Sequence, residues 1–126
     1  MFDGAPAADP MPWSAIWILL ACLVGGGGVV AWVGWRSAAG RLGRNWLVGI
    51  RVPATLESDA AWEAAHRAAG SHMFVGGVVP MVAGPFLLSG PTNGVGAVVV
   101  LAALAWLLTW VVAAGITAQR AARSVD

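Results

Sequence analysis

The side chains that could do chemistry in this chain gather in residues 36–72, between long uncharged apolar stretches. This segment holds five of the seven arginines, three of the six acidic residues and both histidines. Guanidinium groups bind phosphates or carboxylates, and a histidine can exchange a proton near neutral pH. Ionised groups are costly inside hydrocarbon, so charge confined to one connection indicates either a site at a membrane surface or a loop that sets orientation.

Catalytic and metal chemistry find little support in the sequence. His66 and His72 have no cysteine pair nearby, which is a poor basis for a metal site. Serine, histidine and aspartate occur without a nucleophile-elbow pattern, and there is no Walker loop or dinucleotide fingerprint. We therefore predict that the protein is not an enzyme and holds no metal or cofactor.

Composition places the chain outside the soluble globular class. Of its 126 residues 59% are hydrophobic and 10% charged, and the mean hydropathy is +0.76. The net charge of +1 gives no nucleic-acid-binding surface. Residues 10–35 carry no charge, and residues 68–119 carry none apart from the titratable His72. The first stretch suits one membrane-spanning helix and the second suits two, joined by a turn at 89–94.

These stretches predict an all-α polytopic membrane protein with three transmembrane helices plus a short cytoplasmic or interfacial helix. The spans are expected at about residues 13–35, 72–89 and 95–118. Pro80 and Pro85 interrupt the middle span, and we expect a kinked helix because neighbouring helices can re-satisfy the freed carbonyls. The glycines at 25–28 should allow close packing, within the chain rather than between chains.

The domain organisation follows from the spans. Residues 1–11 are expected to form an external disordered tail, residues 12–119 a membrane domain with a cytoplasmic motif segment at 36–71, and residues 120–126 a cytoplasmic tail. Every basic residue is an arginine of the first connection or the C-terminal tail, which places both in the cytoplasm and the N-terminus outside. The Ala, Gly, Val and Arg bias suggests a bacterial source, and hence the bacterial cytoplasmic membrane.

The first connection divides into two pieces. Residues 40–53 alternate glycine, arginine and bulky apolar residues, which predicts an interfacial or re-entrant segment. Pro53 favours an extended conformation for the residues before it. Thr55 or Ser58 should then cap a helix at about 59–69.

That helix would carry the histidine of the motif. Trp62 and His66 would share one face, and Glu63 and Arg67 would form an ion pair in the favourable order. We expect His66 to be packed and hydrogen-bonded, with a proton-linked or ligand role as the lesser alternative. Gly70 either ends this helix or lets it continue into the second span.

The order of residue types in the connection resembles the signature of a known family. The pattern is G-R-N-x-x-x-G-I-R-x-P-x-T-L followed by W-x-x-x-H-R-x-x-G. The residues that carry it are Gly43, Arg44, Asn45, Gly49, Ile50, Arg51, Pro53, Thr55, Leu56, Trp62, His66, Arg67 and Gly70. This pattern is similar to that of the SdpI family of bacterial polytopic membrane proteins. The resemblance is close over residues 43–70 and extends to the two following spans only in hydropathy.

What the resemblance implies is protection from a secreted, membrane-disrupting peptide toxin and a part in relaying its presence to a repressor. Longer members have additional N-terminal spans and a separate module, so the chain is expected to be a short form without them. Within the motif, Arg44 and Arg51 should contact lipid phosphates or pair with nearby acids. Asn45 should cap or cross-link the loop.

We therefore expect an integral membrane protein that protects against, or senses, membrane-active peptides or envelope stress. One alternative is a small accessory subunit of a larger envelope or transporter complex, because three short spans with glycine-rich faces would hardly suffice alone. A weaker alternative is lipid handling by the arginines. The expected partners are the lipid bilayer with its anionic headgroups and other membrane proteins or a toxin peptide, but no nucleic acid.

Overall fold

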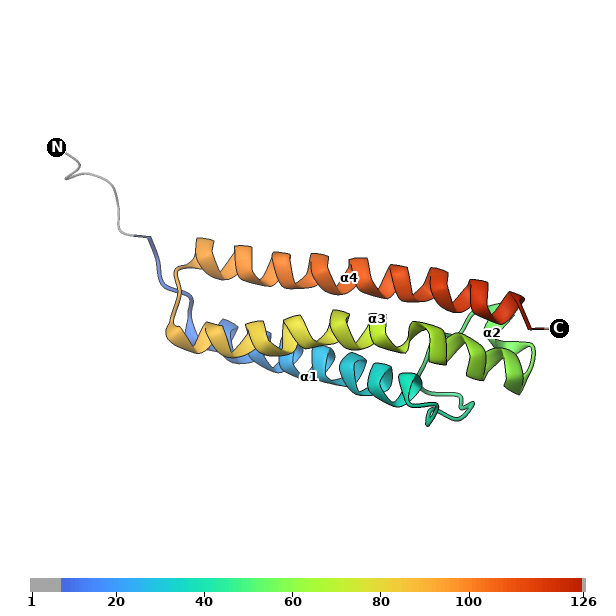
Figure 1. Cartoon of the computed structure of the whole chain (residues 1–126). Coiled ribbons are helices and arrows are strands. Elements are labelled where there is room, and N and C mark those ends of the chain that lie inside the picture. Colours follow the sequence, from blue (N-terminus) through green and yellow to red (C-terminus); the bar gives the residue numbers. More distant parts are fainter. Residues whose placement is uncertain (1–7, 126) are drawn as a thin grey trace.

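The structure, a computed structural model, describes residues 8–125. The elements in chain order are α1 (Trp13–Ala38), α2 (Pro53–Leu56), α3 (Asp59–Phe86), the 3-10 helix η1 (Leu87–Ser89) and α4 (Asn93–Arg123). The three long helices run antiparallel to their neighbours in sequence, with α2 in the connection between α1 and α3 (Figure 1). Each is long and apolar enough to cross a membrane. The prediction of a polytopic all-α membrane protein with three spans and one short helix is confirmed.

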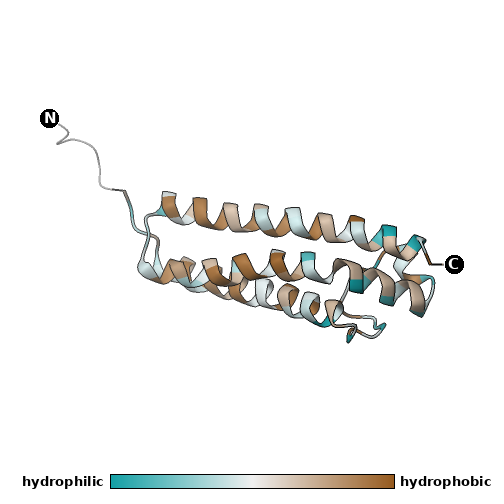
Figure 2. Cartoon of the chain, viewed as in Figure 1, coloured by the Kyte–Doolittle hydropathy of each residue, from teal (hydrophilic) through white to brown (hydrophobic). Residues whose placement is uncertain are grey.

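The central helix is α3, which packs against α1 and against α4, while α1 and α4 scarcely touch. Apolar residues cover most of the length of all three helices, and hydrophilic residues concentrate at the end that holds α2 and the C-terminus (Figure 2). The helices therefore bring the connection between α1 and α3 to one end of the molecule and the turn between α3 and α4 to the other.

Close backbone contact joins α1 to α3. A Cβ atom added to Gly27 would lie 2.6 Å from the carbonyl oxygen of Gly77, and one added to Gly34 would lie 2.6 Å from that of Gly70. No side chain fits at these positions unless the helices move apart. Lipid tails are as apolar as the helices, so dispersion from such close packing is a main source of association in a membrane.

The expected packing of the glycine run within the chain holds for only part of the run. Gly27 contacts α3, and a Cβ on Gly28 would make an ordinary contact, 3.7 Å from the sulfur of Met81. Around Gly25 and Gly26 an added Cβ would meet nothing within 4 Å. These two glycines lie on the face of α1 that points away from α3.

The contact between α3 and α4 uses tryptophan. The indole N–H of Trp106 donates a hydrogen bond to the carbonyl oxygen of Val75 at 3.0 Å. Gly76 leaves room for Trp110, because a Cβ on this glycine would lie 2.7 Å from the Cβ of the tryptophan. The Trp110 ring in turn lies against His72, with ring centroids 5.6 Å apart.

The helix expected at 59–69 is not a separate element. α3 is one helix from Asp59 to Phe86, so Gly70 is a point of continuation and not a cap, and the separate short helix is α2. Pro80 and Pro85 lie inside α3. Its 28 residues reach about 42 Å at 1.5 Å per residue, more than the roughly 30 Å of a bilayer core. The first turns of α3 therefore project beyond the span.

Part of the N-terminal tail differs from the expectation of disorder through residue 11. Residues 1–7 lie outside the described residues. The Met11 amide donates to the carbonyl oxygen of Pro91 at 2.9 Å, and the Asn93 amide donates to that of Asp9 at 2.8 Å. The first amides of α4 have no partner within their own helix, and the Asn93 amide finds its acceptor in this extended segment.

Candidate functional site

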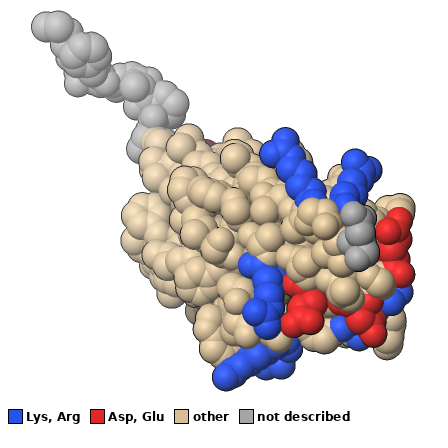
Figure 3. Space-filling view, turned by 45° about the vertical axis from the view of Figure 1, so that its right-hand side comes forward, with Lys and Arg blue, Asp and Glu red and all other residues tan. Residues whose placement is uncertain are grey.

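Charge collects at the end of the molecule that holds α2 and the C-terminus. Figure 3 shows arginine and acidic side chains gathered there, while most of the remaining visible face is uncharged. The charged residues of this end are Arg36, Arg41, Arg44, Arg51, Glu57, Asp59, Glu63, Arg67, Arg120 and Arg123. Within this region the loop at 39–52 folds back onto the first turns of α3, and the motif residues meet.

Asn45 organises the tip of the loop. Its side-chain oxygen accepts hydrogen bonds from the amides of Leu47 and Val48 at 2.9 and 2.8 Å, and its side-chain nitrogen donates to the carbonyl oxygen of Gly43 at 2.9 Å. The prediction that Asn45 cross-links the loop is confirmed. The turn leaves Trp46 and Leu47 exposed at the tip, by 81% and 70%.

The loop ends at α2, where hydrogen bonds of the Thr55 side chain hold the last residues of the loop. Val52 is extended, with φ −115° and ψ 161°, as expected for a residue before Pro53. The buried Thr55 hydroxyl donates to the carbonyl oxygen of Ile50 at 2.8 Å and accepts from the Val52 amide at 3.2 Å. Of the two expected caps of α3 it is Ser58 that serves, because its side-chain oxygen accepts the amide hydrogen of Ala61 at 3.0 Å.

His66 ties the middle of the loop to α3. It is only 2% exposed, and its Nε2 accepts the amide hydrogen of Ile50 at 2.9 Å. Since Nε2 accepts, the proton of the neutral ring is on Nδ1, which donates to the carbonyl oxygen of Trp62 at 2.8 Å. The two rings stack with centroids 4.1 Å apart. The expectation of a packed, hydrogen-bonded histidine is confirmed.

The loop reaches His66 only because residue 49 is glycine. Gly49 has φ +116°, and a Cβ there would lie 2.7 Å from Nε2 of His66 and 2.8 Å from the ring of Trp62. Trp62 is itself buried, and its indole N–H donates to the carbonyl oxygen of Leu42 at 3.0 Å. The loop is therefore held at two points, at residue 42 and at residue 50.

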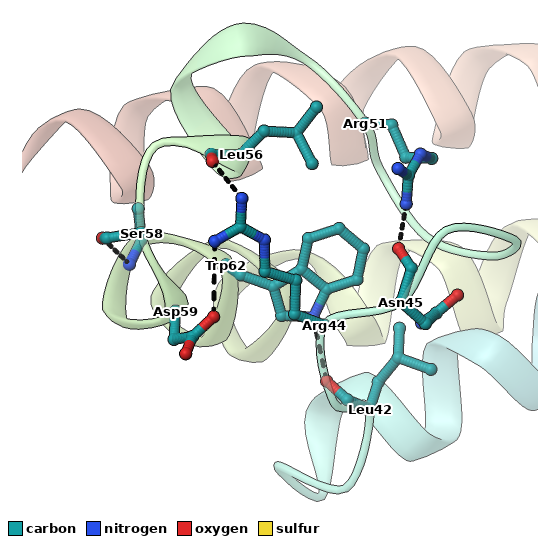
Figure 4. Close-up of polar contacts among 9 residues, drawn as sticks. Leu42, Arg44, Asn45, Arg51, Leu56, Ser58, Asp59 and Trp62 are labelled. Atoms are coloured by element: carbon teal, nitrogen blue, oxygen red, sulfur yellow. Dashed lines mark hydrogen bonds and ion pairs between the residues drawn. The ribbon is translucent and has the colours of Figure 1, made fainter.

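The motif arginines add further ties. Arg44 donates to the carbonyl oxygen of Leu56 and to the carboxylate of Asp59, 3.4 Å away (Figure 4). Arg51 donates to the carbonyl oxygen of Asn45, and its guanidinium lies 5.9 Å from the centroid of the Trp62 ring. Within residues 8–125, the expected ion pair with an acidic side chain thus forms at Arg44 and not at Arg51. An exposed ion pair contributes about 0.2–1 kcal/mol, so its main effect is to orient the loop.

The remaining motif residues lie at the edges of this arrangement. Arg67 forms the expected ion pair with Glu63 at 3.2 Å. Its guanidinium also covers Gly40, which has φ +70°. Gly70 lies deeper and contacts the backbone of α1 at Ala38.

Sequence reasoning missed Gly40 and the carbonyl of Leu42, because a positive φ angle and a backbone acceptor leave no signal in the pattern of residue types.

The environment of His66 favours the neutral ring. Burial lowers the pKa of His66 below its ordinary value of 6.5, and the hydrogen bond to the Trp62 carbonyl opposes this in part. In an unfolded chain the ring would take its ordinary pKa. The associated stability is therefore fully present above about pH 6.5 and is lost as the pH falls below that value.

We expect acid to release the loop from α3. A protonated ring carries hydrogen on both nitrogens and cannot accept the Ile50 amide. The exchange protection of that amide, corrected for the intrinsic pH dependence of exchange, should be constant above neutral pH and fall once the pH drops below the lowered pKa of His66. The Ala61 amide, whose acceptor is the Ser58 hydroxyl, is the control and should keep its protection. Unchanged protection at Ile50 would contradict the assignment.

Comparison with known families agrees with this geometry. The family model described as the SdpI/YfhL protein family matches residues 41–116, which is more than half of the chain and includes α2, α3 and all but the first two residues of the loop. No curated protein and no solved structure matches the chain.

Proposed function

The chain belongs to the SdpI/YfhL family, and from this we propose that it protects the cell against, or senses, membrane-active peptides or envelope stress. The observation that supports the proposal is that the motif residues hold the loop in one conformation. Its polar side chains are bonded to the loop and to the start of α3, so they build one loop of defined shape at the end of a membrane helix. A loop that only set orientation would need arginines but no such specified backbone path.

The orientation we propose places this loop and the C-terminus in the cytoplasm and the N-terminus outside, in a bacterial cytoplasmic membrane. The support is that all seven basic residues lie at one end of the helices. Anionic lipid headgroups would then contact the exposed arginines, while Trp46 and Leu47 at the loop tip dip into the interface. The remaining exposed loop surface would be available to another membrane protein or to a toxin peptide.

A conformational signal would pass from one side of the membrane to the other through α3. This helix is continuous from its Ser58 cap to the 3-10 turn at the opposite end, and it contacts both other helices. A peptide that displaced the helices at the outer end would therefore shift the start of α3, to which the loop is bonded. The proposed signal is a change in the conformation of this loop.

The test is a strain without the gene, challenged with a panel of membrane-active peptides. We expect it to be more sensitive to at least one peptide, and the wild-type gene to restore resistance. Asn45→Ala should fail to restore it, because three hydrogen bonds of the loop are lost. Asn93→Ala is the matched control at the opposite end, where the asparagine is bonded through its backbone. Sensitivity that is unchanged across the panel would overturn the proposal.

A second candidate function is an accessory subunit of a larger envelope or transporter complex. The observation in its favour is that only 11% of an apolar 18-residue stretch of α4 is buried within the chain. A protein subunit or lipid tails could cover this surface. Purification in mild detergent separates the two, because a subunit retains a second chain of defined size, and a chain that purifies by itself excludes the complex.

A further inference from the structure

A cleft of about 510 Å³ opens between the loop that follows α1 and the first turns of α3. Arg41 and Arg44 line it from the loop, and Asp59 and Glu63 line it from α3. The buried Trp62 closes it on the inner side. Arg44 and Asp59 face each other from the two sides of the cleft and are joined by the ion pair described above (Figure 4).

The cleft presents charges of both signs. Among the described residues, the guanidinium of Arg41 donates no hydrogen bond and forms no ion pair, whereas that of Arg44 is held by Asp59 and Leu56. The side chains of Asp59 and Glu63 are 88% and 59% exposed, and each forms its ion pair through one oxygen only. A ligand that fits this set carries an anionic group and a hydrogen-bond-donating cation a short distance apart.

The tryptophans of α1 indicate that the cleft lies near the level of the lipid headgroups. Its lining begins two residues after the end of α1 at Ala38. The exposed rings of Trp35 and Trp32 mark the interface one to two turns before the end of α1, and Arg36 lies 5.4 Å from the centroid of the Trp32 ring. Groups at this level meet phosphodiesters and headgroup amines at high local concentration.

We propose that this cleft binds the headgroup of a zwitterionic phospholipid that carries a primary amine. The phosphodiester accepts hydrogen bonds from Arg41, and the ammonium donates to the free oxygens of Asp59 and Glu63. A purely anionic headgroup would leave these carboxylates facing a like charge. A quaternary amine would have no hydrogen to donate to them. The inference uses the position of the cleft in the membrane and is independent of the proposed protective function.

Gly43 provides a means to test the cleft without disturbing its walls. A Cβ on Gly43 would meet nothing within 4 Å, and its φ angle is not positive. A leucine at this position can therefore extend into the open space that the headgroup would occupy. Gly25 is the matched control, since a Cβ there also meets nothing within 4 Å, on the outer face of α1.

The experiment is lipid retention by the full chain, purified from vesicles that contain equal amounts of ethanolamine, choline and glycerol phospholipids and analysed by native mass spectrometry. We expect the wild type and Gly25→Leu to retain the ethanolamine lipid about tenfold over the choline lipid, the scale of one charge-assisted hydrogen bond. Gly43→Leu and the exposed Arg41→Gln should lose this preference. Equal retention of all three lipids, or preference for the glycerol lipid alone, would overturn the proposal.

A competition experiment distinguishes a site for a membrane lipid from a site for a soluble headgroup compound. Free phosphoethanolamine at millimolar concentration should leave the retained lipid in place, because the acyl chains add apolar contacts with the helices. Full displacement by the soluble compound would show that the cleft is a site for a soluble ligand and would overturn the assignment to a lipid. As a control for folding, Gly43→Leu should show the same helical circular dichroism as Gly25→Leu. Arg41→Gln is a second test variant, which removes a charge from the cleft without filling it.

Discussion

Replacing Gly27 by leucine is expected to separate α1 from α3, whereas replacing the neighbouring Gly26 by leucine should leave the fold intact. A Cβ at Gly27 would come within 2.6 Å of the Gly77 carbonyl oxygen and 2.8 Å of the Met81 amide nitrogen. Both are backbone atoms of α3, so no rotamer change relieves the clash. Overpacking of a rigid interior costs about 1–3 kcal/mol, and we expect the upper end of that range or more here.

The measurement is thermal unfolding in detergent, followed by tryptophan fluorescence. Gly26→Leu adds the same side chain one residue away, where nothing lies within 4 Å, and leucine also has the higher helix propensity. We expect it to melt at or above the temperature of the wild type. Equal destabilisation by both substitutions would mean that α1 does not pack on α3 in the orientation described.

Replacing His66 by phenylalanine is expected to free the loop while the helices stay assembled. Phenylalanine keeps a ring against Trp62 but removes the acceptor of the Ile50 amide. A buried amide left without a partner costs about 1–3 kcal/mol, and this half-buried one falls toward the lower end of that range. Amide exchange at residues 48–52 should therefore accelerate on the order of tenfold. In cells we expect the variant to lose the proposed protection, although the protein is still inserted.

His72→Phe is the matched control. Its Nδ1 is buried without a hydrogen-bond partner among the described residues, so removal of the polar ring breaks no bond there. We expect unchanged exchange in the loop and unchanged or slightly higher thermal stability. If His66→Phe left the loop as protected as in the wild type, the histidine would be only a packing residue and the pH dependence expected above would also be absent.

Features that depend on neighbours in sequence were predicted well. The lengths of the uncharged stretches predicted three spans, and α1 begins at the expected residue 13. The cap by Ser58, the Glu63–Arg67 pair and the turn built by Asn45 each join groups within four residues of one another. Such interactions depend on residue type and spacing alone, because the local backbone brings the partners together.

Features that depend on the rotation of one helix against another could not be predicted. The sequence contains four consecutive glycines, but only the packing on α3 distinguishes Gly27, which cannot carry a side chain, from Gly26, which can. Likewise, Gly70 is compatible with a helix end or with continuation. In the structure α3 continues through Gly70, and this glycine lies against the backbone of α1. That contact exists only when the two helices are packed together.

The sequence by itself therefore determined the membrane class, the number of spans, the family pattern and the local turns and caps. Only the tertiary structure decided what the motif residues do. The ties from Trp62 to Leu42 and from His66 to Ile50 join residues 20 and 16 positions apart. Residue type marks each side chain as a donor or acceptor, but its partner is a backbone group that any residue could supply. Which backbone group comes within reach is set when the loop folds onto α3.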